Sequence, residues 1–142
     1  MGKMAKTKGA NAEREVVKIL QPIVDAVYAS VGLESPTIKR NLEQTRGGGY
    51  DLVGVDWLAL EIKRQEQLSI EAWWRQTVKQ TKPGQTPVLM YRQNNKKWRV
   101  VTMVALRTQP SKAISVRAEI SLDDFLVYFK KKVEYDVSLL DA

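Results

Sequence analysis

The chain has 142 residues and a formal net charge of +7, and it contains neither cysteine nor histidine. The missing cysteine excludes a disulfide framework and a thiolate zinc site, and the missing histidine excludes serine–histidine triads and H-E-x-x-H zinc centres. Any catalysis must therefore use carboxylates, lysine, tyrosine and oxygen-bound metal ions. The length fits one domain, and we predict that it spans residues 10–142, behind a basic and flexible tail at residues 1–9.

The excess of lysine and arginine points to a polyanionic partner, most simply nucleic acid. A soluble protein that happens to be basic is the alternative. No apolar run approaches the ~20 residues of a membrane span, and the N-terminus lacks the apolar core of a signal peptide. These observations predict an intracellular, cytoplasmic protein with no membrane partner.

Apolar residues recur at three-and-four spacing from Ala10 onward and predict an amphipathic helix. Pro22 is expected to kink or restart this helix because it lacks an amide donor. Glu13 stands three residues before Val16 and seven before Leu20, so its carboxylate continues the apolar stripe. Burying a carboxylate is costly unless a charged group meets it. Capture of Glu13 by a buried arginine and a role in a functional site both satisfy that condition.

The later segments alternate between strand and helix patterns. We expect strands at residues 37–42, 87–92, 98–104 and 114–120, a hairpin at 51–63, a helix capped by Ser69 that ends at 82–84, and a C-terminal helix capped by Ser121. This order predicts an α/β (α+β) fold, in which helices flank a mixed central β-sheet.

Residues 47–65 contain the acidic residues on which the functional prediction depends. Side chains alternate between the two faces of a strand, so Glu61 and Lys63 project to the same side. Asp51 joins them if a three-residue loop at 55–57 pairs Asp51 with Glu61. The same register would give one apolar face to four residues: Leu52, Leu58, Leu60 and Ile62. We therefore predict that two carboxylates and an ammonium converge.

This combination of side chains suits a metal-dependent phosphodiesterase. Mg²⁺ takes oxygen ligands, usually one or two carboxylates completed by water and substrate phosphate. The backbone carbonyl of Ile62, between Glu61 and Lys63, could supply a further oxygen. A bound metal lowers the pKa of water, and a neighbouring lysine stabilises the developing charge. The expected cofactor is Mg²⁺, for which Mn²⁺ should substitute.

The series Asp51, Glu61, Ile62, Lys63 resembles the signature of the PD-(D/E)xK nuclease superfamily, in which an acidic residue precedes Glu-x-Lys on the next strand. Tyr50 stands where that signature usually has proline. The segments KGANAEREVVKIL, RNLEQTRGGGYDL and LEIKRQEQLSIEAWWRQ are similar to archaeal-type Holliday-junction resolvases and their phage-encoded relatives. The resemblance implies a restriction-endonuclease-like fold.

The resemblance also implies roles for two residues outside the hairpin. It makes Glu13 the third acid of the metal site, which would account for a glutamate on an apolar stripe. It gives Gln76, on the helix after the motif, as a weaker catalytic candidate that supports the site. An ordinary exposed helix position is the alternative for Gln76.

By the same resemblance, the expected function is a metal-dependent, structure-selective DNA endonuclease. It would be a Holliday-junction resolvase of phage origin that acts as a homodimer on four-way junctions in the bacterial host cytoplasm. A nicking, flap or general nuclease of the same fold is one alternative. A non-catalytic basic DNA-binding or virion-structural protein is the alternative from another class.

Basic side chains around the motif are candidate DNA contacts, each against the alternative of ordinary surface charge. They are Lys8, Arg40, Arg46, Arg64, Arg75 and Lys79. The run Gly47–Gly49 either lets the backbone approach a ligand closely or forms a flexible loop. We interpret Glu15 as an ordinary flank of the first helix.

Overall fold

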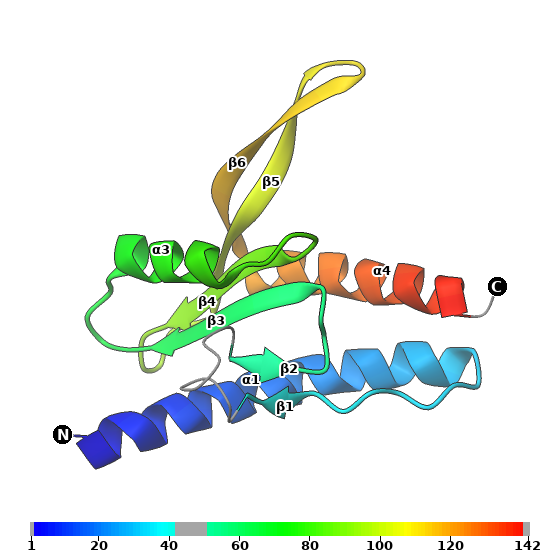
Figure 1. Cartoon of the computed structure of the whole chain (residues 1–142). Helices are drawn as coiled ribbons and strands as arrows, with labels where there is room; N and C mark the ends of the chain where they lie inside the picture. Colours follow the sequence, from blue (N-terminus) through cyan, green and yellow to red (C-terminus); the bar gives the residue numbers. More distant parts are fainter. Residues whose placement is uncertain (1, 42–50, 141–142) are drawn as a thin grey trace.

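A computed structural model of the chain describes residues 2–41 and 51–140. These residues form one domain in which helices flank a four-stranded mixed sheet (Figure 1), so the predicted α+β, restriction-endonuclease-like architecture is confirmed. The elements are α1 (Gly2–Ser30), β1 (Lys39–Arg40), β2 (Leu52–Val53), β3 (Leu58–Arg64), α3 (Ile70–Gln80), β4 (Thr86–Arg92), β5 (Arg99–Gln109), β6 (Lys112–Ser121) and α4 (Leu122–Leu140).

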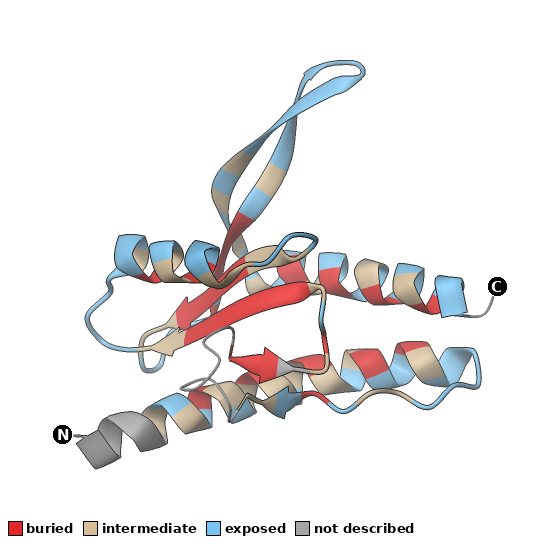
Figure 2. Cartoon of the chain, viewed as in Figure 1, coloured by how far each residue is buried: buried red, intermediate tan, exposed pale blue. Residues whose placement is uncertain are grey.

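The main sheet has the strand order β3-β4-β5-β6. β3 and β4 run parallel and are connected through α3, whereas β4, β5 and β6 are successively antiparallel. β3 and β4 are apolar along most of their length because both of their faces are covered. Figure 2 shows the resulting layer of buried residues between the helices.

Alternation along β3 separates two packing layers. Leu58, Leu60 and Ile62 face the larger core, which α1 and α4 close with residues such as Val16 and Phe125. The smaller cluster lies on the opposite face, where Trp73 of α3 packs against three strand residues: Leu89, Tyr91 and Val101. The face of the sheet that α3 covers is also the face that receives the side chain of Glu61.

Helix α1 is longer than predicted, because it begins at Gly2 and not at Ala10. The expected tail at residues 1–9 is therefore helical from Gly2 onward. Its lysines, methionine and alanine are good helix formers, and the basic charge alone gave no reason for the helix to stop. The helix also runs through Pro22 without restarting.

The predicted hairpin register is wrong. β2 pairs with β1, where Arg40 is opposite Leu52, and it forms no ladder with β3. The connection at residues 54–57 has an even number of residues, and a backbone hydrogen bond from Leu58 to Val55 closes it at 3.0 Å. The predicted apolar face survives this change, since Leu52, Leu58, Leu60 and Ile62 are all buried in one core.

Gly54 explains why β2 departs from β3. Its φ is 106°, and a Cβ at this position would lie 2.6 Å from the carbonyl oxygen of Thr37. Only glycine permits so close an approach together with a positive φ. The chain before β1 therefore passes directly over Gly54, and β2 aligns with β1.

The distal parts of β5 and β6 leave the body of the protein. The last pair between β4 and β5 is Val88 with Thr102, and beyond it the two strands continue as a projecting ribbon (Figure 1). We call residues 103–117 the arm. Both strands are longer than the predicted 98–104 and 114–120. The predicted cap of α4 is confirmed, because the Asp124 amide donates to Ser121 Oγ at 3.0 Å.

Candidate active site

A pocket of about 690 Å³ opens where β3 ends. Side chains reach it from α1, from the segment before β2, from β3 and its following loop, and from α3. The pocket lining includes every predicted catalytic residue, the predicted carbonyl donor and two predicted DNA contacts: Glu13, Asp51, Glu61, Lys63, Gln76, Ile62, Lys8 and Arg64. The fold thus brings together residues that lie far apart in the sequence.

Glu61 is the most deeply buried charged residue of this pocket, with 2% of its surface exposed. Its Oε1 accepts a hydrogen bond from Gln76 Nε2 at 3.1 Å and lies 3.3 Å from Lys63 Nζ. Its Oε2 is buried and has no hydrogen-bond partner among the described residues. Because an unsatisfied buried carboxylate oxygen is costly, Oε2 is a strong acceptor for a cationic ligand.

The environment of Glu61 opposes its ionisation. Burial raises the pKa of this carboxyl group, the ammonium of Lys63 partly offsets that effect, and the negative charge of Glu13 adds to it. Glu13 therefore lies close enough to Glu61 for the two charges to repel one another. Additional positive charge in the pocket would favour the ionised form of Glu61.

Asp51 is fixed to the edge of β3 although β2 is not part of that sheet. Its side chain is buried, and Oδ2 accepts a hydrogen bond from the Ile62 amide at 2.6 Å. Its own amide donates to the Leu60 carbonyl at 2.8 Å. An edge strand presents unpaired amides and carbonyls, and Asp51 uses two of them. This arrangement replaces the predicted pairing of Asp51 with Glu61 and still places both carboxylates in one pocket.

Glu13 reaches the pocket from α1 but is bound to an arginine. Its Oε1 accepts a hydrogen bond from Arg40 Nε at 2.8 Å, and its side chain is largely buried. Within residues 2–41 and 51–140, no three acidic side chains form a group arranged to hold a metal ion. Capture by arginine, one of the two interpretations of Glu13, therefore describes this structure, and direct metal ligation by Glu13 stays a prediction.

A comparison with protein families shows the family to which the chain belongs. The model of a family described as "Phage putative PDDEXK endonuclease" matches residues 4–141. The chain belongs to this family of phage PDDEXK endonucleases. Searches among curated proteins and among solved structures gave no match. The predicted PD-(D/E)xK membership and phage type are confirmed, and DNA is the substrate that an endonuclease family implies.

The predicted DNA contacts of the endonuclease occupy different positions. Lys8 and Arg64 line the pocket, and Arg40 is held by Glu13. Arg75 and Lys79 lie exposed on α3. Arg46 and the run Gly47–Gly49 lie outside the described residues.

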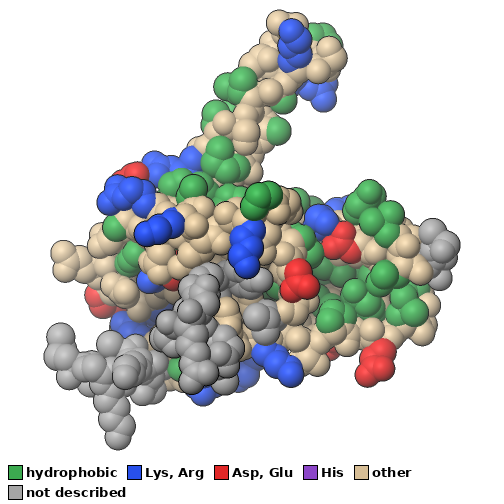
Figure 3. Space-filling view, viewed as in Figure 1, with side chains coloured by type: hydrophobic (Ala, Val, Ile, Leu, Met, Phe, Trp, Pro, Cys, Tyr) green, Lys and Arg blue, Asp and Glu red, His purple; other side chains and the backbone are tan. Residues whose placement is uncertain are grey.

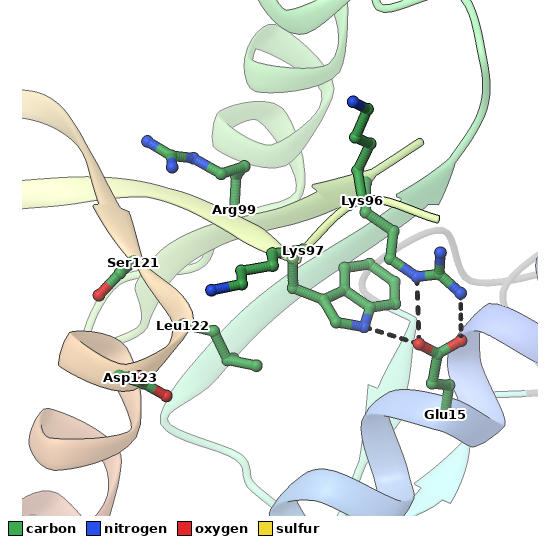
Figure 4. Close-up of a pocket in the computed structure, with 9 residues that line it drawn as sticks. Glu15, Lys96, Lys97, Arg99, Ser121, Leu122 and Asp123 are labelled. Atoms are coloured by element: carbon green, nitrogen blue, oxygen red, sulfur yellow. Dashed lines mark hydrogen bonds and ion pairs between the residues drawn. The ribbon is translucent and has the colours of Figure 1, made fainter. Parts of the chain in front are cut away.

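Glu15 has a structural role in the endonuclease that we did not predict from the sequence. At a second pocket, of about 400 Å³, its carboxylate accepts hydrogen bonds from Arg92 Nε at 3.1 Å and Nη2 at 3.0 Å, and from Trp98 Nε1 at 2.9 Å (Figure 4). These bonds fasten α1 to the end of the sheet, two residues from Glu13. The donors lie more than seventy residues away in the chain, so the sequence around Glu15 contains no signal of the contact.

Burial opposes ionisation of Glu15, but the hydrogen bonds from Arg92 and Trp98 outweigh it and hold the pKa of this carboxyl below its usual value of 4.5. The hydrogen bonds that hold α1 at Glu15 are therefore charge-assisted at neutral pH.

In the described ranges, no helix of the endonuclease combines the length and the apolar content needed to cross a bilayer.

Proposed function

We propose that this endonuclease hydrolyses DNA phosphodiester bonds with a divalent metal ion held by Asp51 and Glu61. The observation that carries the proposal is the buried Oε2 of Glu61, which has no hydrogen-bond partner among the described residues and lies in the pocket that Asp51 also lines. Mg²⁺ commonly takes one or two carboxylates and completes its shell with water and phosphate. The two buried carboxylates fit that requirement.

The metal would supply positive charge to the scissile phosphate and activate water for attack. Mg²⁺ is the proposed physiological ion, and Mn²⁺ should substitute for it because both accept the same oxygen ligands. We extend the ligand set to the backbone carbonyl of Ile62 and to Glu13, which would have to exchange Arg40 for the ion.

Two side chains of the pocket complete the proposed chemistry. Lys63 is partly exposed beside Glu61, so its ammonium can contact a phosphate oxygen and stabilise the charge that develops on it. Gln76 donates to Oε1 of Glu61 and holds the carboxylate in place, which leaves Oε2 for the ion. Gln76 is thus a positioning residue, whereas Lys63 acts on the substrate.

For the substrate we propose branched DNA, specifically the four-way junction, cut by a homodimer in the cytoplasm of the bacterial host. A dimer with two-fold symmetry presents identical sites to the two opposed strands of a junction. The net charge of +7 and the resemblance to Holliday-junction resolvases support this choice. The motif itself determines the bond chemistry and leaves the shape of the DNA open.

The test is cleavage of labelled four-way junction, flap, nicked and plain duplex DNA of equal length in Mg²⁺. The proposal predicts paired, symmetric incisions in the junction at rates well above those in the other substrates. Preferential cleavage of the flap or the nicked duplex would support the nuclease assignment and contradict the assignment as a resolvase.

Calorimetry separates the nuclease from a non-catalytic DNA-binding or virion protein. The wild type should take up Mn²⁺, and the variants Asp51→Asn and Glu61→Gln should each weaken that uptake at least tenfold, because each removes one ionised oxygen ligand. Metal uptake unaffected by either substitution would reject the proposed site.

A further inference from the structure

In the part of the chain that the structure describes, the arm contributes no residue to the candidate active site and does not pack into either core cluster beyond its base. At ~3.3 Å per residue, β5 extends about 23 Å beyond its last pair with β4. A two-stranded ribbon has no core of its own and is marginal in water. Its projection from the body (Figure 1) therefore calls for a role outside folding.

The arm is basic and contains no acidic residue. Its charged residues are Arg107, Lys112 and Arg117. Arg117, at the base, is bound to Glu71 of α3 at 2.6 Å. Arg107 and Lys112 are exposed near the tip, and no ion pair within the described ranges involves either of them; Figure 3 shows the cationic side chains at that end. The tip thus presents two positive charges that form no ion pair with other described residues.

The two faces of the arm differ in chemistry. Two cross-strand pairs form the apolar face: Val104 with Val116 and Leu106 with Ile114. The other face carries Arg107 opposite Ala113, and Lys112 follows at the tip, where it pairs with Gln109 beyond the register shift after Arg107. Apolar cross-strand pairs stabilise a ribbon, so the first face can stiffen the arm while the second stays free for a ligand.

The strand registers place Arg107 on the face of β5 that continues from the side of the sheet where Glu61 lies. Glu61 is opposite Leu89, and Leu89 is opposite Val101. Alternation from Val101 brings Arg107 to this same face. The two positions are separated by about 20 Å along β5 and by two strand spacings of ~4.8 Å, which is less than one turn of duplex DNA.

We propose that the arm is a DNA-binding ribbon whose basic tip, with Arg107 and Lys112, enters the major groove of the duplex cut at the candidate active site, within one helical turn of the cut. The major groove is about 12 Å wide and admits a two-stranded β-ribbon. Charge complementarity selects DNA over a protein partner, because the tip is cationic and the substrate is a polyanion. The position of the cut rests on the proposed function; binding by the arm does not.

The first test measures affinity for a short labelled duplex in EDTA, where metal-dependent cleavage does not interfere. The double variant Arg107→Gln/Lys112→Gln is compared with Lys130→Gln/Lys131→Gln, which removes the same charge from exposed positions on α4. The arm variant should bind roughly tenfold more weakly and lower the slope of log affinity against log salt by about 2. The α4 variant should match the wild type. Equal affinity and slope for the two variants would overturn the proposal.

The second test identifies the groove. Methylation of guanine N7 by dimethyl sulfate reports on the major groove, and the wild type should protect guanines within one turn of the cut. That protection should disappear in the arm variant and persist in the α4 variant. Protection that survives in the arm variant would place another element in the groove and contradict the proposal.

The apolar face provides the competing outcome. If Leu106→Ser/Ile114→Ser splits a dimer in sedimentation while Arg107→Gln/Lys112→Gln binds DNA like the wild type, the arm is a protein interface and the proposal is wrong. If the wild type binds DNA through the arm but cuts no DNA in Mg²⁺, the proposed function is wrong and the proposal of DNA binding by the arm stands.

Discussion

The backbone amide of Ile62 donates a hydrogen bond of 2.6 Å to the carboxylate of Asp51. This contact joins the segment before β2 to the open edge of β3, although β2 pairs with β1. It therefore explains how Asp51 and Glu61 share a pocket without the hairpin ladder that the sequence predicted. The contact also makes Asp51 a structural residue as well as a candidate ligand.

Replacing Asp51 should separate these two roles. Asp51→Ala leaves the Ile62 amide without its acceptor and should cost about 1–3 kcal/mol of unfolding free energy. Asp51→Asn keeps an acceptor oxygen and should recover most of that stability, yet it should cleave DNA as poorly as the alanine variant. Urea denaturation and a plasmid cleavage assay measure the two effects. Equal stability of the alanine variant and the wild type would contradict the structural role.

Glu61→Gln should change how stability depends on pH in the metal-free protein. Burial raises the pKa of Glu61 above the usual 4.5, so the folded state favours the protonated form. The associated stability is fully present below pH 4.5 and is lost as pH rises through the raised folded value. The difference in free energy of unfolding, variant minus wild type, should therefore increase as pH rises. Urea titrations in EDTA at several pH values test this, and a difference that decreases as pH rises would disprove it.

The site could be predicted from the sequence because its chemistry depends on local spacing. Alternation on β3 places Glu61 beside Lys63, and the helical period places Glu13 on the inner side of α1. Both relationships hold whatever the partner strand is. This is why the candidate residues line one pocket although the register of Asp51 differs from the predicted one.

The features that the prediction missed depend on contacts between distant segments. The pairing of β2 with β1 follows from the close approach of Gly54 to Thr37, and the bond from Arg40 to Glu13 depends on where β1 crosses α1. The predicted strands stopped short of the arm, because its outer residues have no core to bury them and so lack the pattern of a buried strand. No local pattern in the sequence contains this information.

Gln76 and Gln80 lie one helical turn apart on α3 and form a matched pair of substitutions. Gln76→Ala removes the hydrogen bond to Glu61 Oε1 and should reduce kcat about tenfold or more, because the carboxylate loses its orientation. Its KM for DNA should change little. Gln80→Ala should retain wild-type kcat. Steady-state cleavage rates decide the matter, and an equal loss in both variants would show that the effect comes from α3 as a whole.

Glu15→Gln should weaken the anchor of α1 and change the acid sensitivity of the fold. The lowered pKa of Glu15 means that its ionised form stabilises the native state above pH 4.5, and this stability is lost as pH falls through the lower folded value. The variant should be less stable than the wild type at neutral pH, and the difference should shrink in acid. Thermal or urea unfolding followed with pH tests this prediction. A difference that stays constant with pH would contradict it.

The most direct test of the proposed metal-dependent site is plasmid cleavage by the wild type and Glu61→Gln, each in Mg²⁺ and in EDTA. Glutamine keeps the size of the side chain and the acceptor for Gln76, while it removes the charge that would bind the ion. The account predicts cleavage only by the wild type in Mg²⁺, with a loss of at least a hundredfold in the variant. Cleavage of the plasmid by Glu61→Gln at the wild-type rate, or by the wild type in EDTA, would contradict it.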